Sequence, residues 1–255
     1  MPSVHRVARR RLVSTLRDNL DRFRKLADET ARDPTPDRVH DLRVVTRRIR
    51  ADFWLVPRPH RSRAIRRARR DLEHLAAILG EQRKYDVAMG DAARYGSQTR
   101  RIEQRLQVAQ RKVSRALGDK DRRRCARRLT RAISDLNELD NAVLGSRVPR
   151  LARRLEVARH CPPKTNAARH RLRIDVKRAR YLLEATRRPA AHLERLQDHL
   201  GRWHDLMLLL KVAGRRKAVT AACAREWRLA KRCLQPALRQ AMRELLLLVT
   251  DERLE

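Results

Sequence analysis

The stretch VHDLRVVTRRIR, residues 39–50, returns as RHRLRIDVKRAR, residues 169–180, and this repeat decides the fold of the chain. Counted from His40 and His170, a basic residue stands three, seven, eight and ten positions onward in both copies. A leucine also follows each histidine by two positions. Basic composition alone does not explain such agreement, so the chain contains an internal repeat and two related halves.

Each copy of the repeat predicts an amphipathic helix. At about 100° per residue, the apolar side chains fall on one side of the helix and the cations on the other. The predicted packing faces are Leu42, Val45, Ile49 and Phe53 in the first copy, and Leu172, Val176, Ala179 and Leu183 in the second. The predicted cationic rows are His40, Arg43, Arg47 and Arg50, and His170, Arg173, Lys177 and Arg180, with Arg48 and Arg178 at their edges.

The cationic rows contain no acidic residue. Like charges three or four residues apart destabilise a helix by a few tenths of a kcal/mol per pair, and a solvated face usually mixes Glu with Arg. The rows therefore favour an external anion, although a solvated face remains the alternative. Two roles for His40 and His170 also remain open, which are direct contact with phosphate and a structural hydrogen bond at a helix start.

The composition points to an all-α protein with a polyanionic partner. The 255 residues include 64 Lys and Arg against 30 Asp and Glu, a formal net charge of +34. Such a charge repels itself in the compact state and attracts large anions. Hydrophobic residues make up 42% of the chain, enough for a core, while 7 Gly and 3% aromatic residues favour helices over strands.

Pro and Gly divide the chain into roughly ten helices. Thr35 and Thr165 are the expected N-caps of the two repeated helices. A boundary at Gly145 separates an N-terminal half, 1–144, from a C-terminal half, 145–255. The expected helices cover about 4–31, 36–56, 61–79, 82–95, 98–117, 120–144, a short segment ending near 159, 166–187, 190–200, and long helices beyond.

A second pair of segments, residues 79–87 and 200–206, follows the first. Each has Leu-Gly and then an aspartate, Asp86 or Asp205. We expect the glycines to end helices and each aspartate to lie near a helix N-terminus, where the helix dipole favours it. An added role in orienting an Arg or His of the repeated helix is also open.

Several function classes lack their signature here. The cysteines at 125, 161, 223 and 233 form no C-x-x-C pair and have no His at zinc spacing, so they are expected to be reduced packing residues. A signal-type or membrane-spanning apolar run is missing as well, which predicts a cytoplasmic chain. Neither clustered carboxylates for a catalytic metal nor a phosphate-binding Gly-rich loop occurs, so we expect no enzyme activity, no metal and no cofactor.

The two His-x-x-Arg-x-x-x-(Arg/Lys)-Arg-x-Arg helices, Tyr181 after the second, and the two Leu-Gly segments resemble the conserved histidine α-helical domain (CHAD) family. The resemblance covers nearly the whole chain as a single domain, 1–255. Lys84 departs from the family pattern, because it stands where an acidic residue would be typical. Family members often accompany triphosphate-tunnel hydrolase domains, whose Glu-x-Glu-x-Lys signature is absent here.

The resemblance implies two four-helix bundles, related by a pseudo-twofold axis, around a basic central cavity that binds inorganic polyphosphate. It also implies an association with polyphosphate or storage granules. Nucleic acid is the alternative partner, but the chain has only eight Phe, Trp and Tyr residues for stacking bases and no recognisable nucleic-acid-binding motif. The polyphosphate-binding candidates are His40, Arg43, Arg47, Arg48, Arg50, Arg83, His170, Arg173, Lys177, Arg178, Arg180 and Tyr181.

Overall fold

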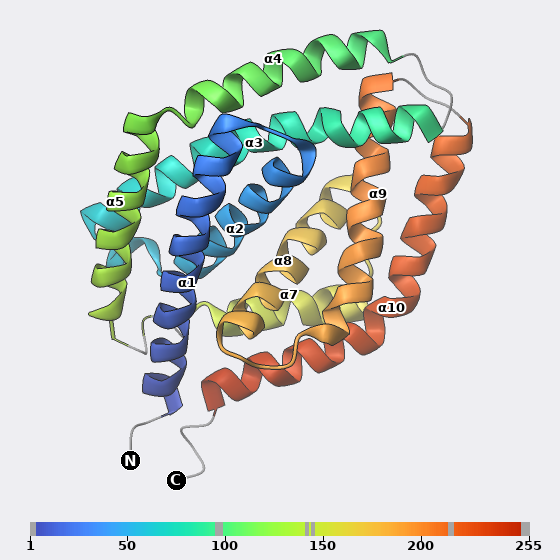
Figure 1. The fold of residues 1–255 in the computed structure, drawn as a ribbon. Coiled ribbons are helices and arrows are strands. Elements are labelled where there is room, and N and C mark those ends of the chain that lie inside the picture. Colours follow the sequence, from blue (N-terminus) through green and yellow to red (C-terminus); the bar gives the residue numbers. More distant parts are fainter. Residues whose placement is uncertain (1–3, 95–98, 141–142, 144–145, 214–216, 251–255) are drawn as a thin grey trace.

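The computed structural model of the chain describes residues 4–94, 99–140, 143, 146–213 and 217–250, and these fold almost entirely into helices (Figure 1). No strand occurs in these ranges, as the composition predicts. The α-helices are α1 (Val4–Arg32), α2 (Pro36–Trp54), α3 (Arg63–Arg94), α4 (Arg100–Ala116), α5 (Asp119–Asn137), α7 (Val148–His160), α8 (Asn166–Ala185), α9 (Glu194–Ala213) and α10 (Lys217–Thr250). Short 3-10 helices cover Arg58–His60 and Ala191–Leu193.

The repeated segments form α2 and α8, and both helices start in the same way. The Thr35 hydroxyl accepts a hydrogen bond from the backbone N–H of Arg38, at 3.4 Å. The Thr165 hydroxyl likewise accepts from the N–H of Ala168, at 3.2 Å. Each cap satisfies one of the free N–H groups of a first turn, which confirms both predicted N-caps.

The packing faces of α2 and α8 are also confirmed. Each of the eight apolar residues predicted to face inward is buried, and seven of them are 0% exposed, Leu172 being 4% exposed. They join one hydrophobic core that includes Phe23 of α1 and Trp203 of α9. Because this apolar side of each helix is fixed in the core, the cationic side must lie on the opposite surface.

The helix contacts fall into an N-terminal set and a C-terminal set. In the first, α2 and α3 pack together and α4 and α5 lie against α3 and α1; in the second, α10 packs on α9 and α7, and α8 lies beside α7 and α9. The pairs α2–α8 and α3–α9 join the two sets.

Figure 1 shows that α4 and α5 meet at a corner and that α10 bends in a similar way along its length. Pro236 lies inside α10 and removes one helix hydrogen bond there. The two-bundle arrangement with a pseudo-twofold axis stays a prediction.

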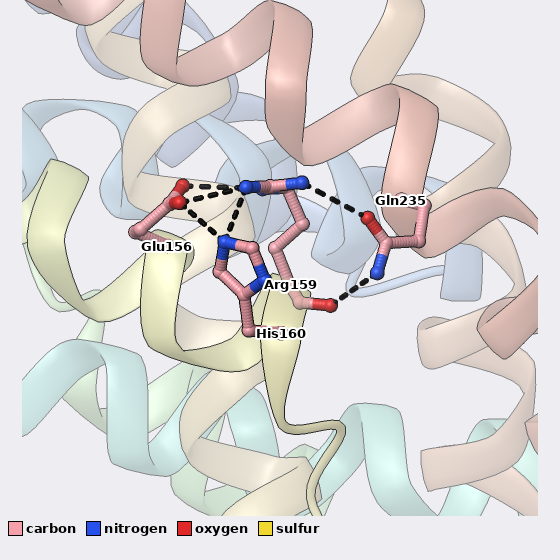
Figure 2. Close-up of polar contacts among 4 residues, drawn as sticks. All are labelled: Glu156, Arg159, His160 and Gln235. Atoms are coloured by element: carbon pink, nitrogen blue, oxygen red, sulfur yellow. Dashed lines mark hydrogen bonds and ion pairs between the residues drawn. The ribbon is translucent and has the colours of Figure 1, made fainter.

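A polar cluster joins the end of α7 to α10 (Figure 2). The Arg159 guanidinium donates to Glu156 at 2.7 Å and to the Gln235 side-chain oxygen at 3.2 Å. The Gln235 amide in turn donates to the Arg159 backbone carbonyl at 2.6 Å, and His160 lies 2.7 Å from Glu156. This two-way contact between Arg159 and Gln235 satisfies a carbonyl in the last turn of α7 and fixes that turn to α10.

The expectation that Gly80 and Gly201 end helices was wrong. Gly80 lies inside α3 and Gly201 inside α9. A glycine within a helix costs only about 1 kcal/mol relative to alanine, and burial of the flanking leucines in the core outweighs that cost. Consequently Asp86 and Asp205 stand in helix interiors, not near N-termini. A Cβ on Gly80 would lie 4.0 Å from the Arg43 side chain, an ordinary van der Waals distance, so α3 passes next to Arg43 at this point.

Other helix ends and the cysteines also differ in part from expectation. The helix expected over 120–144 ends at Asn137, and the predicted boundary at 144–145 lies outside the described residues. The four cysteines are free, as predicted. Cys125, Cys223 and Cys233 are buried or half-buried, but Cys161 is exposed just after α7 and is therefore not a packing residue.

Candidate functional site

Two pockets lie where α2 and α8 meet. The first, the α3–α9 pocket, has a volume of about 330 Å³; the second, the Trp54 pocket, has a volume of about 260 Å³. The α3–α9 pocket is lined by His40, Arg43, Arg47, Gly80, Arg83, Lys84, Val87, Arg173, Lys177, Gln197, Asp198, Gly201, Arg202, His204, Asp205 and Leu208. The Trp54 pocket is lined by Arg43, Arg47, Arg50, Ala51, Trp54, Arg69, Glu73, Arg173, Ile174, Lys177, Arg178 and Tyr181.

Four cations line both pockets, and we call them the shared cations: Arg43 and Arg47 of α2, and Arg173 and Lys177 of α8. They stand three and seven positions after the two repeat histidines. All four are buried or half-buried, and Arg173 is only 9% exposed. Within the described part of the chain none of the four forms an ion pair, and the Nε of Arg173 is buried without an acceptor. The two cationic rows therefore converge on one place that lacks internal neutralisation.

Burial and mutual repulsion lower the pKa of three shared cations. The pKa of Arg43 falls to about 9, first through burial and then through Arg47 and Arg173. The pKa of Arg173 falls to about 10, through burial and then Arg47. The largest change is at Lys177, whose pKa falls to about 6 through burial and then the three guanidiniums. Removal from water disfavours a charged group, and like charges nearby add to that cost.

One carboxylate in the α3–α9 pocket counters this repulsion. Asp205 of α9 lines the α3–α9 pocket and raises the pKa values of Arg43, Arg173 and Lys177. Burial raises the pKa of Asp205 itself, while these cations oppose that shift. The residue at the corresponding place of α3, four positions after its glycine, is Lys84, which lines the same pocket. In total seven Lys and Arg but only two Asp line this pocket, so it is strongly cationic.

Three histidines lie in or beside the α3–α9 pocket. His40 lines the α3–α9 pocket, and its buried Nδ1 has no hydrogen-bond partner. His170 is not among the lining residues; instead its ring lies 4.9 Å from the ring of His204, which does line the pocket. Burial lowers the pKa of both repeat histidines and, followed by the charge of Arg173, lowers the pKa of His204 to about 3. Burial therefore favours the neutral form of all three rings.

Three candidate arginines carry internal ion pairs. Arg48 lies 3.3 Å from Glu184, and Arg180 lies 2.6 Å from the same residue and 3.2 Å from Glu194. Arg178 lies 3.3 Å from Asp175. Arg48 and Arg180 line neither pocket, whereas Arg178 lines the Trp54 pocket. These pairs separate the partly neutralised arginines at the edge from the shared cations at the centre.

The remaining candidates divide between the two pockets. Arg83 lines the α3–α9 pocket, while Arg50 and Tyr181 line the Trp54 pocket. Tyr181 is 6% exposed, and the Arg48 guanidinium lies 5.9 Å from its ring centroid. Both Arg147 and Arg178 approach the Trp54 ring, at 5.3 and 5.0 Å from its centroid. The aromatic rings of this pocket therefore contact cations of the protein itself.

Sequence reasoning missed Lys84, His204 and Asp205 as lining residues. The signal was present in the spacing. Gly80, Arg83, Lys84 and Val87 share the pattern i, i+3, i+4, i+7 with Gly201, His204, Asp205 and Leu208. On one continuous helix this pattern places four residues on one face. Sequence reasoning does not find this pattern, because it treats the two glycines as helix ends.

The arrangement suits the binding of a multiply charged anion. Guanidinium groups donate several N–H bonds in a planar fork that matches phosphate oxygens. No group of three or more metal-ligating side chains occurs among the described residues. In the same ranges, no helix is long and apolar enough to cross a bilayer.

Comparisons with known proteins agree with this architecture. The chain is similar to the crystal structure of the CHAD domain from the plant Ricinus communis, with a TM-score of 0.64 and 21% identity over 93% of this chain and 91% of that one. It is also similar to PptA from Streptomyces chartreusis, with a TM-score of 0.59 and 18% identity over 96% and 99%. No protein of curated function matches the sequence. Because the CHAD domain model matches residues 14–214, the chain belongs to the CHAD domain family.

Proposed function

We propose that this protein binds inorganic polyphosphate through the shared cations Arg43, Arg47, Arg173 and Lys177. One observation carries the proposal: these four side chains, two from each repeat, line both pockets and have no ion-pair partner in the described structure. A polyphosphate chain presents a continuous row of charged oxygens that can contact all four. The predicted site residues Arg50, Arg83 and Arg178 lie along the same two pockets and extend the contact surface.

The energetics favour an extended anion over an isolated ion. Each buried cation raises the free-energy cost of keeping its neighbours charged, so electrostatic repulsion destabilises the free site. A chain of phosphates relieves that repulsion at several cations at once and forms charge-assisted hydrogen bonds with them. It also releases counterions, so the affinity should fall steeply as salt rises.

Nucleic acid is the competing partner, and the aromatic residues argue against it. Single-strand binding uses exposed aromatic rings on which bases stack. At this site Tyr181 is buried, and the Trp54 ring is approached by Arg147 and Arg178. A base would have to displace a cation to reach either ring. A ligand without bases avoids that cost.

We further propose that the site binds its ligand without breaking phosphoanhydride bonds. The lining residues of both pockets include only Glu73, Asp198 and Asp205 as acids, and Glu73 is already bound to Arg69 at 3.2 Å. The residues that line these two pockets therefore include no cluster of carboxylates that could activate a water molecule. Phosphate release from long-chain polyphosphate by the purified protein, with and without added Mg²⁺, would contradict this proposal.

Filter binding tests the proposed ligand. Labelled long-chain polyphosphate is titrated with the protein, and unlabelled polyphosphate, RNA and single-stranded DNA of matched charge compete. We expect polyphosphate to compete at least about tenfold better than either nucleic acid, because Tyr181 is buried and the Trp54 ring is already approached by arginines of the protein. Equal competition by RNA or DNA would overturn the proposal in favour of nucleic acid.

A further inference from the structure

We propose that Lys177 is a covalent modification site whose amine takes the acyl group of an acyl phosphate. The site combines an amine and a phosphate cradle in one place, because Lys177 lines both pockets together with three guanidiniums. This reactivity goes beyond the binding of polyphosphate. It would convert an amine that can take up a proton into an amide that cannot.

The repeat itself singles out Lys177. The residue seven positions after the histidine is Arg47 in the first copy and Lys177 in the second. A guanidinium stays protonated at any pH a cell experiences, whereas a buried ammonium loses its proton readily. Where four cations share a site, lysine is therefore the member that can become neutral and nucleophilic.

The surroundings of Lys177 favour the neutral amine. Arg43, Arg47 and Arg173 face it from α2 and α8, and the one carboxylate that counters them is Asp205 of α9. No ion pair or hydrogen bond of the Lys177 amine occurs in the described structure, so its nitrogen is not committed to an acceptor. The burial and charge that lower its pKa to about 6 leave most of the amine unprotonated near pH 7.

The same guanidiniums can hold the phosphate of the reagent. They would bind the phosphoryl oxygens of an acyl phosphate and place its carbonyl carbon beside the amine. The nitrogen lone pair then forms a bond to the carbonyl carbon while the bond from that carbon to the phosphate oxygen breaks. The phosphate leaves with the electron pair and takes the proton released by the nitrogen, so the products are an amide and hydrogen phosphate.

Acylation would change the site that carries the proposed function. The amide at position 177 cannot take up a proton beside a bound phosphate, so the liganded pocket would have three shared cations, where the unmodified protein can have four. This consequence, unlike the acylation itself, rests on the proposed binding of polyphosphate. Acylation would then weaken polyphosphate binding, and bound polyphosphate would in turn shield Lys177 from the reagent.

Mass spectrometry after timed treatment with acetyl phosphate tests the inference on the full chain at pH 7. Lys231 of α10 and Lys164 before α8 serve as exposed reference lysines within the same molecule. We expect Lys177 to be acetylated at least about tenfold faster than either, because neither reference lysine lines the two pockets whose guanidiniums would hold the phosphate of the reagent. Equal rates at Lys177 and Lys231 would overturn the inference.

A second reagent separates the cradle from simple amine reactivity. The N-hydroxysuccinimide ester of acetic acid carries no phosphate, so the preference for Lys177 over Lys231 should be at least about threefold smaller with it than with acetyl phosphate. An equal preference would refute the role of the guanidiniums.

Long-chain polyphosphate added before acetyl phosphate distinguishes this inference from the proposed function. Rapid acetylation of Lys177 that added polyphosphate does not slow would contradict the proposed binding of polyphosphate at this site, but not the modification. Measured binding of polyphosphate without selective acetylation would contradict the modification alone.

Discussion

Arg43 and Arg173 occupy the same position of the two repeats and lie close enough across the site that the charge of Arg173 lowers the pKa of Arg43. Both side chains line both pockets. Two buried like charges at the junction of α2 and α8 are a cost to the free protein that no described ion pair offsets. The repeat therefore places its cations where a bound anion would relieve the most electrostatic repulsion.

A paired charge reversal tests whether these two arginines act as a site. Arg43→Glu with Arg173→Glu should weaken polyphosphate binding on the order of a hundredfold, because two charge-assisted contacts are lost and two repulsions are added. Filter binding at fixed salt measures the change.

The matched control for this charge reversal is Arg123→Glu with Arg225→Glu, two exposed residues of α5 and α10. It changes the net charge by the same amount, so we expect a loss below about tenfold from long-range electrostatics alone. Circular dichroism checks that both variants stay helical. Equal losses in the two pairs would show that affinity follows overall charge, not the shared cations.

Neutralising Arg173 should stabilise the free protein while it weakens binding. Arg173→Met keeps an apolar stem but removes a charge that is 9% exposed and whose Nε has no acceptor. We expect the free energy of unfolding to rise by about 1 kcal/mol, or the Tm by about 2–4 °C, in thermal melts at low salt. A lower Tm would mean that the buried charge is compensated by contacts that the structure does not contain.

The sequence predicted the parts of the fold that depend on one helix at a time. The apolar and cationic faces of α2 and α8 follow from helical periodicity, and Thr35 and Thr165 cap them as expected. The family resemblance added the idea of a shared basic cavity. What was mispredicted is the continuation of α3 and α9 through Gly80 and Gly201, because tertiary packing there overrides the local preference of glycine.

The sequence did not reveal how charges pair across helices. The rows of α2 and α8 contain no acid, yet Arg48 and Arg180 both meet Glu184, and Arg180 also meets Glu194. Glu184 lies four residues after Arg180, but Arg48 reaches it from the other repeat. Only the packing of α2 against α8 brings Arg48 to that carboxylate. The three-dimensional structure is therefore needed to distinguish the ion-paired arginines at the edge of the site from the shared cations at its centre.

Arg180 should matter for stability more than for binding. Arg180→Met removes ion pairs at 2.6 Å to Glu184 and 3.2 Å to Glu194 and leaves Glu184 less well neutralised. We expect the free energy of unfolding to fall by about 1 kcal/mol in urea titrations, and the Kd for polyphosphate to change by less than about threefold. Arg173→Met is the matched control, with the opposite pattern. A large loss of affinity in the Arg180 variant would place this residue in direct contact with the ligand.

The pH dependence of stability should report Lys177 in the free protein. Its folded-state pKa of about 6 lies below the usual value for an unfolded chain, about 10.4, so the unfolded state binds more protons between these values. Stability should therefore rise with pH across that window. Urea titrations at pH 6.5 and 8.5 should show a larger increase for the wild type than for Lys177→Met, which cannot titrate there. The same increase in both proteins would assign the effect to other groups.

The affinity for polyphosphate should change with pH in the opposite direction to stability, because phosphates beside Lys177 favour its ammonium form. Between about pH 6 and pH 10 the complex then binds up to one proton more than the free protein, so the affinity falls as pH rises, by at most about tenfold per pH unit. Calorimetric titrations at pH 7.5 in two buffers of different ionisation enthalpy measure this proton uptake directly. Lys177→Arg keeps a fixed charge at the same place, so it should bind polyphosphate with little proton uptake and a flatter pH profile. If the arginine variant takes up as many protons as the wild type, the titrating group is His40, His170 or His204 instead. If the wild type takes up none, Lys177 is already charged before the ligand binds.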